Sequence, residues 1–260
     1  MTILDKLANH AKERVNLAKQ SLSLQDIKKQ AFSLSKGNFE FERALKNADF
    51  AFICECKKAS PSKGIIAEDF DYLNIAKEYE KAGANCISVL TEPKWFLGSD
   101  KYLKEITQNV SIPCIRKDFT VDEYMIYEAK ILGAKAILLI CSILSGEQIK
   151  NYIKICDDLG LSALVEAHNE DEIKTAINSG ARIIGVNNRN LKDFTVDTKN
   201  SENLRKLVPK DIIFIAESGI TNAQDIKNLK NNNVNGVLIG ETLMKAQNKQ
   251  QKLLELKSML

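Results

Sequence analysis

Six polar residues stand where apolar runs of the sequence end, and their types are those that hold or transfer protons. They are Glu55, Lys57, Lys117, Glu166, Asn187 and Glu217. Buried parallel strands read as short apolar runs, and polar side chains are tolerated where such strands emerge. Closely packed charges shift one another's pKa values, so that a lysine becomes usable as an acid and a glutamate as a base near neutral pH. The pattern therefore predicts acid–base chemistry at the carboxyl ends of several strands.

The elements that must position these residues follow from a repeating unit: an amphipathic stretch, a glycine such as Gly160, and an apolar run. The expected strands are residues 51–57, 87–90, 112–116, 136–141, 162–166, 183–187, 212–217 and 237–239. Strands that alternate with helices in this way favour a closed (β/α)8 TIM barrel, with an open doubly wound sheet as the alternative. Because side chains alternate along a strand, Glu55 and Lys57 share one face and point into the barrel mouth. Alone, such a pair would indicate only an ion pair that tolerates burial.

The two ends of the chain do not show the repeating unit of amphipathic stretch, glycine and apolar run. Apolar residues recur at helical spacing from Ile3 to Val15, and a second helical stretch begins near Leu24. We expect one barrel domain over residues 1–260, in which residues 1–45 form a helical extension. That extension closes one barrel end or forms a dimer contact, and the sequence leaves both open. Residues 243–260 are expected to form the eighth barrel helix.

The loops after the last two predicted strands each carry a glycine, in Ser218-Gly219 and in Gly240-Glu241. Glycines at a helix amino terminus let backbone N–H groups approach an anion, and this pair of loops is the frequent phosphate site of barrels. A plain tight turn is the other interpretation. Residues 60–64 form either a mobile lid or an ordinary surface loop. An apolar slot for an aromatic ring is expected, although ordinary core packing would explain the same residues: Phe96, Phe119, Leu138 and Ile140.

Composition excludes several functional classes. The net charge of +3 arises from 37 basic and 34 acidic residues without a basic block, so we expect a small anionic ligand and no nucleic acid. The six cysteines form no CxxC pair or zinc pattern and are interpreted as reduced core residues. The amino terminus lacks a signal-peptide core, and no apolar run could span a membrane. We therefore expect a cytoplasmic protein. His10 and His168 are the only histidines, so a metal or Ser/His/Asp mechanism has almost no residues to use.

The order of these motifs resembles indole-3-glycerol-phosphate synthase, a barrel enzyme of tryptophan biosynthesis. The resemblance rests on residues 54–64 (CECKKASPSKG), 88–92 (SVLTE), 96–99 (FLGS), 116–119 (RKDF), 164–168 (LVEAH), 185–189 (GVNNR), 216–220 (AESGI) and 238–241 (LIGE). An amino-terminal helical extension is also typical of the family. The resemblance implies a substrate, 1-(2-carboxyphenylamino)-1-deoxyribulose 5-phosphate, and three products: indole-3-glycerol phosphate, carbon dioxide and water. It also implies that the reaction requires neither a metal nor an organic cofactor.

The resemblance also implies roles for individual residues. Lys117 would be the general acid that protonates the ketone oxygen, and Glu166 the base for the dehydration. Lys57 would pair with the substrate carboxylate, and the division of the proton-donor role between the two lysines stays open. Around the lysines and the sugar hydroxyls would lie Glu55, Asn187 and Glu217, and at the anionic ends of the substrate Ser60 and Arg189. The phosphate would be bound by Ser218, Gly219, Gly240 and the Glu241 backbone. The aromatic ring would lie among Phe96, Phe119, Leu138 and Ile140.

Two positions depart from the family pattern. Trp95 stands where a tyrosine or phenylalanine is common, and Glu241 stands where some members have a serine that could bind phosphate. Two other functions are compatible with a barrel of this kind: another phosphosugar enzyme with a different acid–base pair, or a non-catalytic barrel subunit. Association with other enzymes of the tryptophan pathway is also possible.

Overall fold

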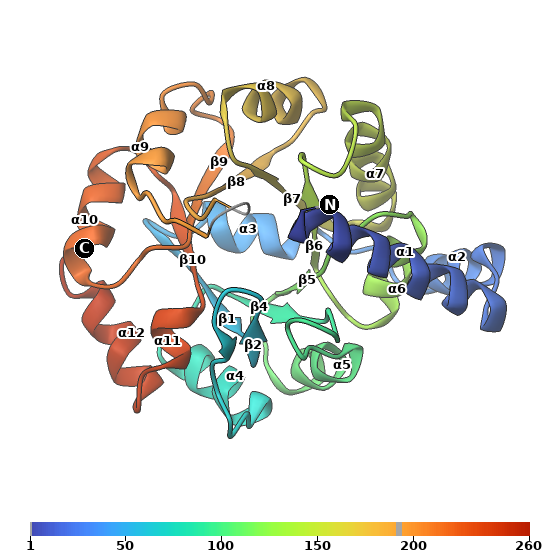
Figure 1. Cartoon of the computed structure of the whole chain (residues 1–260), viewed down its shortest axis with the longest axis horizontal. Helices are drawn as coiled ribbons and strands as arrows, with labels where there is room; N and C mark the ends of the chain where they lie inside the picture. The colour runs from blue at the N-terminus through green and yellow to red at the C-terminus, as the bar shows by residue number, and fades with distance from the viewer. Residues whose placement is uncertain (1, 191–193) are drawn as a thin grey trace.

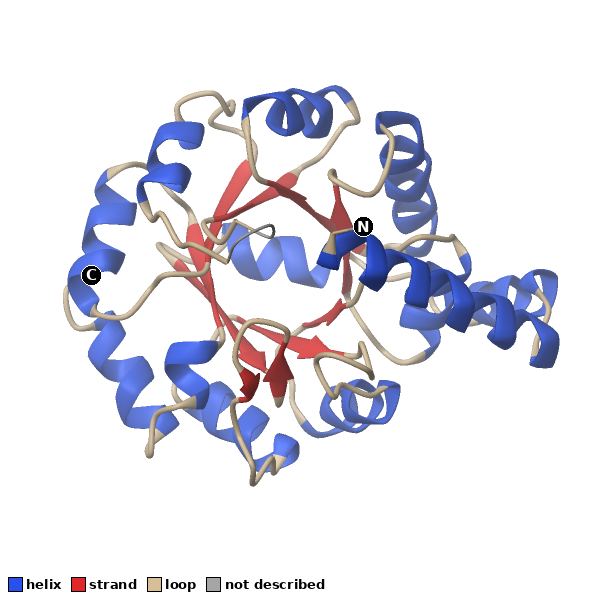
Figure 2. Ribbon diagram, in the orientation of Figure 1, coloured by secondary structure: helices blue, strands red, loops and turns tan. Residues whose placement is uncertain are grey.

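The barrel predicted from the sequence is confirmed. The computed structural model describes residues 2–190 and 194–260, and within them eight parallel strands form one closed barrel (Figures 1 and 2). The barrel strands are β1 (Ala51–Cys56), β4 (Cys86–Leu90), β5 (Cys114–Lys117), β6 (Ala136–Ile140), β7 (Ser162–Ala167), β8 (Ile183–Asn187), β9 (Ile213–Glu217) and β10 (Gly236–Ile239). β1 pairs with both β4 and β10, which closes the sheet and excludes the open alternative.

Side chains alternate between the inside and the outside of the barrel, as the period of two requires. On β1, Cys54 and Cys56 pack outward in the apolar cluster that also holds the helix residue Tyr79. Ile53 belongs instead to the inner cluster, together with Leu164 of β7. Glu55 therefore faces the interior, at the end of its strand where the apolar lining stops. This alternation places the predicted polar groups at one end of the barrel.

Helices surround the barrel and return the chain from each strand to the next (Figure 2). They are α4 (Tyr72–Lys81), α5 (Asp100–Asn109), α6 (Tyr124–Ile131), α7 (Gly146–Leu159), α8 (Glu170–Asn178), α9 (Lys199–Arg205), α10 (Ala223–Asn231), α11 (Glu241–Met244) and α12 (Lys249–Lys257). The prediction of a single helix over residues 243–260 is wrong. α11 ends at Met244, and Asn248 starts α12 by accepting a hydrogen bond from the N–H of Gln251 at 2.8 Å.

The amino-terminal extension contains α1 (Ile3–Ser21), α2 (Leu24–Ser33) and a third helix that the sequence analysis did not separate, α3 (Glu40–Lys46). In Figure 1, α1 lies across the near opening of the barrel, and α3 is seen at its far end. Phe41 and Leu45 of α3 are buried in the inner apolar cluster. The N–H of Glu42 donates to Ser162 Oγ, at the start of β7, over 3.1 Å. Thus α3 closes the amino-terminal end of the barrel.

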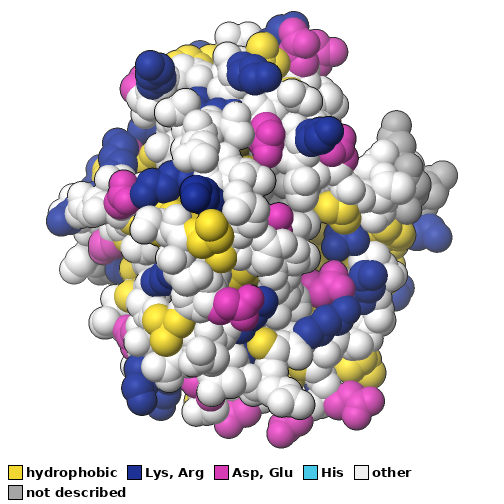
Figure 3. Space-filling view, turned by 90° about the vertical axis from the view of Figure 1, so that its left-hand side faces the viewer, with side chains coloured by type: hydrophobic (Ala, Val, Ile, Leu, Met, Phe, Trp, Pro, Cys, Tyr) yellow, Lys and Arg dark blue, Asp and Glu magenta, His cyan; other side chains and the backbone are white. Residues whose placement is uncertain are grey.

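The loop after β1 forms a small antiparallel hairpin of β2 (Ala59–Ser60) and β3 (Gly64–Ile65). Gly64 has a φ of +64°, a conformation that favours glycine in this tight connection. On the face drawn in Figure 3, basic and acidic side chains are interspersed, in keeping with the small net charge. None of the helices in the described ranges has the length and apolar character needed to cross a membrane.

Candidate active site

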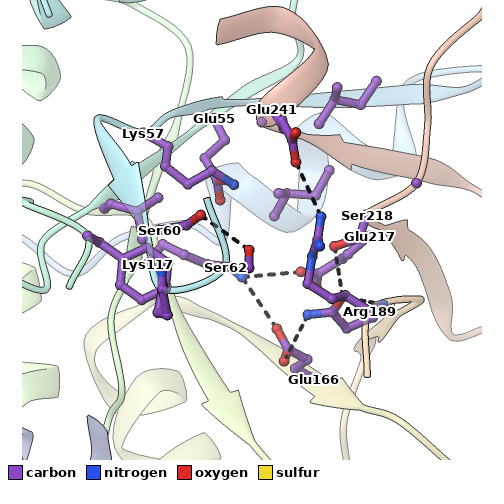
Figure 4. A pocket seen from close by; sticks show the side chains of 18 of the residues that line it. Glu55, Lys57, Ser60, Ser62, Lys117, Glu166, Arg189, Glu217, Ser218 and Glu241 are labelled. Carbon is purple, nitrogen blue, oxygen red and sulfur yellow. Dashed lines mark hydrogen bonds and ion pairs between the residues drawn. The ribbon is translucent and has the colours of Figure 1, made fainter. Parts of the chain in front are cut away.

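A cavity of about 650 Å³ opens at the carboxyl ends of the strands, and every predicted site residue contributes to its lining. Figure 4 shows the labelled lysine and glutamate side chains converging there from different strands. Three residues of α1 that the sequence analysis did not assign to the site, Ile3, Leu4 and Leu7, also line it. The barrel mouth and the amino-terminal helix α1 therefore form the cavity together.

Lys117, the last residue of β5, lies between two carboxylates. Its Nζ is 3.3 Å from Glu166 Oε2 and 3.2 Å from Glu217 Oε2. Burial alone would lower the pKa of Lys117, but Glu217 and Glu166 outweigh this effect and raise it. For Glu166, burial raises the pKa, yet Lys117 and neighbouring donors hold it below its usual range. The amine is therefore charged, and Glu166 is ionised beside it.

Glu217 differs from Glu166 although both contact the same amine. Burial, only partly offset by Lys117, raises the pKa of Glu217 to about 7. Two carboxylates whose pKa values are pushed apart by their surroundings are suited to different roles. Gly185 of β8 makes room for Glu217, because a Cβ at that position would lie 2.2 Å from Glu217 Oε1. This is a physical reason for glycine inside a barrel strand.

The second lysine forms its own pair at the end of β1. Lys57 Nζ lies 2.6 Å from Glu55 Oε1, and Ser88 of β4 donates to Glu55 Oε2 over 3.4 Å. Burial raises the pKa of Glu55, but Lys57 and Lys117 outweigh it and hold the pKa below the usual value. Gly240 is required here for space, since a Cβ would lie 2.3 Å from Glu55 Oε1 and 2.8 Å from Lys57 Nζ.

Polar groups at the ends of β8, β9 and β10 form the opposite side of the cavity. Asn187 Oδ1 accepts hydrogen bonds from the Ser218 hydroxyl at 2.8 Å and from the Arg189 N–H at 3.0 Å. Arg189 Nη2 lies 3.3 Å from Glu241 Oε2, and Lys245 Nζ lies 2.6 Å from the other carboxylate oxygen. The side chain of Glu241 thus engages the guanidinium group that the sequence analysis assigned to an anionic part of the substrate.

The predicted apolar slot is present as a group of neighbouring side chains. The rings of Phe96 and Phe119 lie 6.0 Å apart at an interplanar angle of 41°. Leu138 and Ile140 project from β6 into the inner apolar cluster and line the same cavity. Apolar walls beside charged groups suit a ligand that has a flat ring at one end and anionic groups at the other.

Comparison with known proteins identifies the family. A family model described as indole-3-glycerol phosphate synthase matches residues 4–256. The chain belongs to the indole-3-glycerol phosphate synthase family. A relative of that name from Ruminiclostridium cellulolyticum is 58% identical over 94% of both chains. Another, from Lachnoclostridium phytofermentans, is 54% identical over 99% of this chain and all of that one. A solved thiamine phosphate pyrophosphorylase from Pyrococcus furiosus shares the fold, with a TM-score of 0.61 and 15% identity, over 84% of this chain and 96% of that one.

Two buried carboxylates of this indole-3-glycerol phosphate synthase family member were missed as parts of the site. Glu92 accepts hydrogen bonds from the N–H groups of Lys94, Trp95 and Phe96 at 2.7–3.0 Å, and so fixes the loop that carries Phe96. Asp118 accepts two hydrogen bonds from Arg14 of α1, at 3.1 and 2.6 Å. Asp118 directly follows Lys117, the polar end of β5, and Glu92 stands two residues after the end of β4; these positions after strands were the available signal.

Lysines and carboxylates account for most of the charged side chains that line the cavity. In the described part of the chain, no group of three or more histidine, cysteine, aspartate or glutamate side chains is arranged to hold a metal ion. The cavity instead offers a charged amine, Lys117, directly beside the ionised carboxylate of Glu166. Such a pair can donate a proton at one atom of a ligand and remove one at another.

Proposed function

We propose that this cavity converts 1-(2-carboxyphenylamino)-1-deoxyribulose 5-phosphate into indole-3-glycerol phosphate, carbon dioxide and water. Membership of the family makes the chain a decarboxylating lyase of tryptophan biosynthesis. The observation that carries the assignment to this site is Lys117 held between Glu166 and Glu217 at the mouth of the barrel. An acid and a base are thereby available within one cavity that also has apolar walls.

In the first step the ring carbon that bears the carboxylate attacks the ketone carbon. Lys117 donates its proton to the ketone oxygen, which becomes a hydroxyl group. The bond to the carboxylate then breaks, carbon dioxide leaves, and its electron pair restores the aromatic ring. Preorganised positive charge stabilises the oxygen as negative charge develops on it, and this is usually the largest contribution that a site makes to such a step.

In the second step the hydroxyl group leaves as water, and the neighbouring carbon loses a proton to Glu166. Glu166 then returns this proton to the neutral amine of Lys117, which lies 3.3 Å away. Water formation requires one further proton, so each turnover takes up one proton from solvent. Glu217, which lies 3.2 Å from the Lys117 amine, stabilises its charged form before the first step and again once the proton has been returned.

The remaining groups bind the substrate. We assign its carboxylate to Lys57, which Glu55 orients at 2.6 Å, and its ring to the slot of Phe96, Phe119, Leu138 and Ile140. The phosphate is assigned to Ser218, Gly219, Gly240 and the Glu241 backbone, with Ser60 and Arg189 at the anionic ends and Asn187 at the sugar. Glu241 holds Arg189 through an ion pair, so we expect this carboxylate to turn away when the dianion binds.

We propose one domain over residues 1–260, with residues 1–45 as its extension, because α1 and α3 both pack on the barrel. A cytoplasmic location is supported by cysteines that are all free in the described residues. We also propose that the protein associates with other enzymes of the tryptophan pathway, in keeping with its family.

The proposed function is tested by one assay. Purified protein is incubated with the carboxyphenylamino substrate, and indole fluorescence and released carbon dioxide are followed in parallel, with and without a chelator. We expect equal amounts of both products, and unchanged rates after chelation, because lysines supply the positive charge that a Lewis acid would bring. Absence of the indole product would refute the proposal, and activity that requires an added divalent ion would refute the role given to Lys117.

A further inference from the structure

His168, which the proposed mechanism does not use, lies directly behind the proposed base. Its Nε2 is 3.2 Å from Glu166 Oε1, whereas Lys117 contacts the other oxygen, Oε2, at 3.3 Å. Asn187 Nδ2 adds a 3.5 Å hydrogen bond to Oε1. The Glu166 carboxylate is therefore held from two sides by groups that carry protons, one on β5 and one just beyond the end of β7.

The imidazole ring is itself held in place by α8. Glu172 Oε2 lies 3.0 Å from His168 Nδ1 and accepts the backbone N–H of His168 at 2.8 Å. Ser142 donates to the other Glu172 oxygen at 2.7 Å and lies 3.3 Å from Nδ1. A ring whose Nδ1 is fixed by a carboxylate presents Nε2 in one direction, which is how positioned histidines are oriented in many enzymes.

The surroundings favour the doubly protonated ring. Burial alone would lower the pKa of His168, but the carboxylates of Glu166 and Glu172 outweigh it and raise the pKa to about 10. Nε2 is buried and has no hydrogen bond of good geometry within the part of the chain that is described. The ion pair with Glu166, at 3.2 Å, compensates the charge of the protonated ring on this side. The other titratable groups near Glu166 and His168 are Lys117 and Glu217 across the cavity and the half-buried thiol of Cys141, whose pKa is raised chiefly by partial burial.

We propose that His168 is a positioning residue for the reaction: as a cation anchored by Glu172, it fixes the Glu166 carboxylate opposite Lys117 and keeps it ionised until the dehydration step. This inference rests on the proposed function. Before reaction, two cations face Glu166. Once Lys117 has given its proton to the ketone oxygen, only His168 remains charged, and Glu166 becomes a stronger base at the step that requires it. His168 keeps its own proton throughout.

The test is His168→Gln, which removes the charge but keeps a polar side chain. A misplacement of about 1 Å in a reacting group costs about 10²-fold in rate, so we expect kcat to fall between tenfold and a hundredfold while KM stays within about threefold. Loss of the cation raises the pKa of Glu166. The acidic limb of the kcat profile therefore moves to higher pH, by about one unit for each tenfold change in the protonation equilibrium.

Two further variants separate this role from a purely structural one. Glu172→Gln should shift the acidic limb in the same direction, and the double variant should resemble His168→Gln, because both residues act through one chain of contacts. Lys174→Gln is the matched control, since Lys174 lies on α8 but its ion pairs with Glu170 and Asp171 are exposed. A reduced kcat with an unmoved acidic limb, or additive losses in the double variant, would overturn the proposal.

A measurement without substrate keeps this inference distinct from the proposed function. The chain has only two histidines, so the imidazole NMR signals of the whole protein are assigned by comparison with His168→Gln. The His168 signal should remain that of a protonated ring at pH 7.5 and change near pH 10. A signal that titrates near the ordinary value of about 6.5 would overturn the proposal even if the parent is active. If the parent forms no indole product, the proposed function fails, while the NMR result still decides the charge state.

Discussion

Replacing Gly185 by alanine tests whether a strand glycine sets the geometry of the proposed acid. The added Cβ would lie 2.2 Å from Glu217 Oε1, more than 1 Å inside ordinary contact at 3.4 Å. Gly185 is paired with Glu166 on one side and Ile215 on the other, so the strand cannot easily retreat. Glu217 must therefore move, and its 3.2 Å contact with Lys117 is lost. A shift of about 1 Å predicts a fall in kcat of about 10²-fold.

Stability should change much less than activity, because overpacking by one methyl group costs about 1–3 kcal/mol. The assay is indole fluorescence under saturating substrate, together with Tm from thermal unfolding. Gly146→Ala is the matched control. Its new Cβ would meet nothing closer than 3.4 Å, and alanine in a helix is favoured over glycine, so kcat should be unchanged and Tm equal or higher. A folded Gly185→Ala protein with kcat within about threefold of the parent would refute the reasoning.

Three other perturbations address the acid, the anion site and the extension. Lys117→Met should lower kcat by about 10²–10⁴-fold with a smaller change in KM. The control Lys135→Met, which removes an ion pair with Glu40, should leave kcat unchanged. A fall in kcat of less than about tenfold for Lys117→Met would contradict the acid role. Inorganic sulfate should compete with substrate, and a crystal soaked in sulfate should show the anion at Ser218 and Gly240. Sulfate density elsewhere, with these two loops empty, would exclude the proposed phosphate site. For Asp118, burial raises the pKa, but Arg14 and Arg116 outweigh it. The ion pair of Arg14 and Asp118 therefore stabilises the fold at pH 7. Its contribution to stability is lost as the pH falls through the lowered Asp118 pKa. Arg14→Met should lower the free energy of unfolding by about 3 kcal/mol at pH 7 and by less in acid, which is followed as the fall in Tm. Equal losses at both pH values would contradict the role given to this ion pair.

The barrel strands were predictable because one physical pattern marks them all. Each is a short apolar run, and the residue types at its end show which end faces the site. Alternation along β1 correctly placed Glu55 inside and the flanking cysteines, Cys54 and Cys56, outside. The assembly of the predicted site residues around one cavity followed from the same rule, since the carboxyl ends of parallel strands meet at one end of a barrel.

Features that depend on contacts between distant segments were not predictable. Arg14 carries no local sign that it pairs with Asp118, and α3 is too short for its apolar residues to reveal that it closes a barrel end. The carboxyl-terminal helix was expected as one element because the stretch was interpreted as a single lysine-rich amphipathic helix, and the capping role of Asn248 at the start of α12 was not recognised. The orientation of His168 likewise depends on Glu172, whose position is fixed only by the packing of α8.

The docking of the extension at both ends of the barrel also determines when it can fold. Arg14 and Asp118 are separated by 104 positions, and Glu42 and Ser162 by 120. At a synthesis rate of about 5–20 residues per second, Arg14 is made roughly 5–20 s before Asp118. During that interval Phe41 and Leu45 have no barrel to enter. This segment is thus made before the barrel strands but is among the last to reach its final contacts.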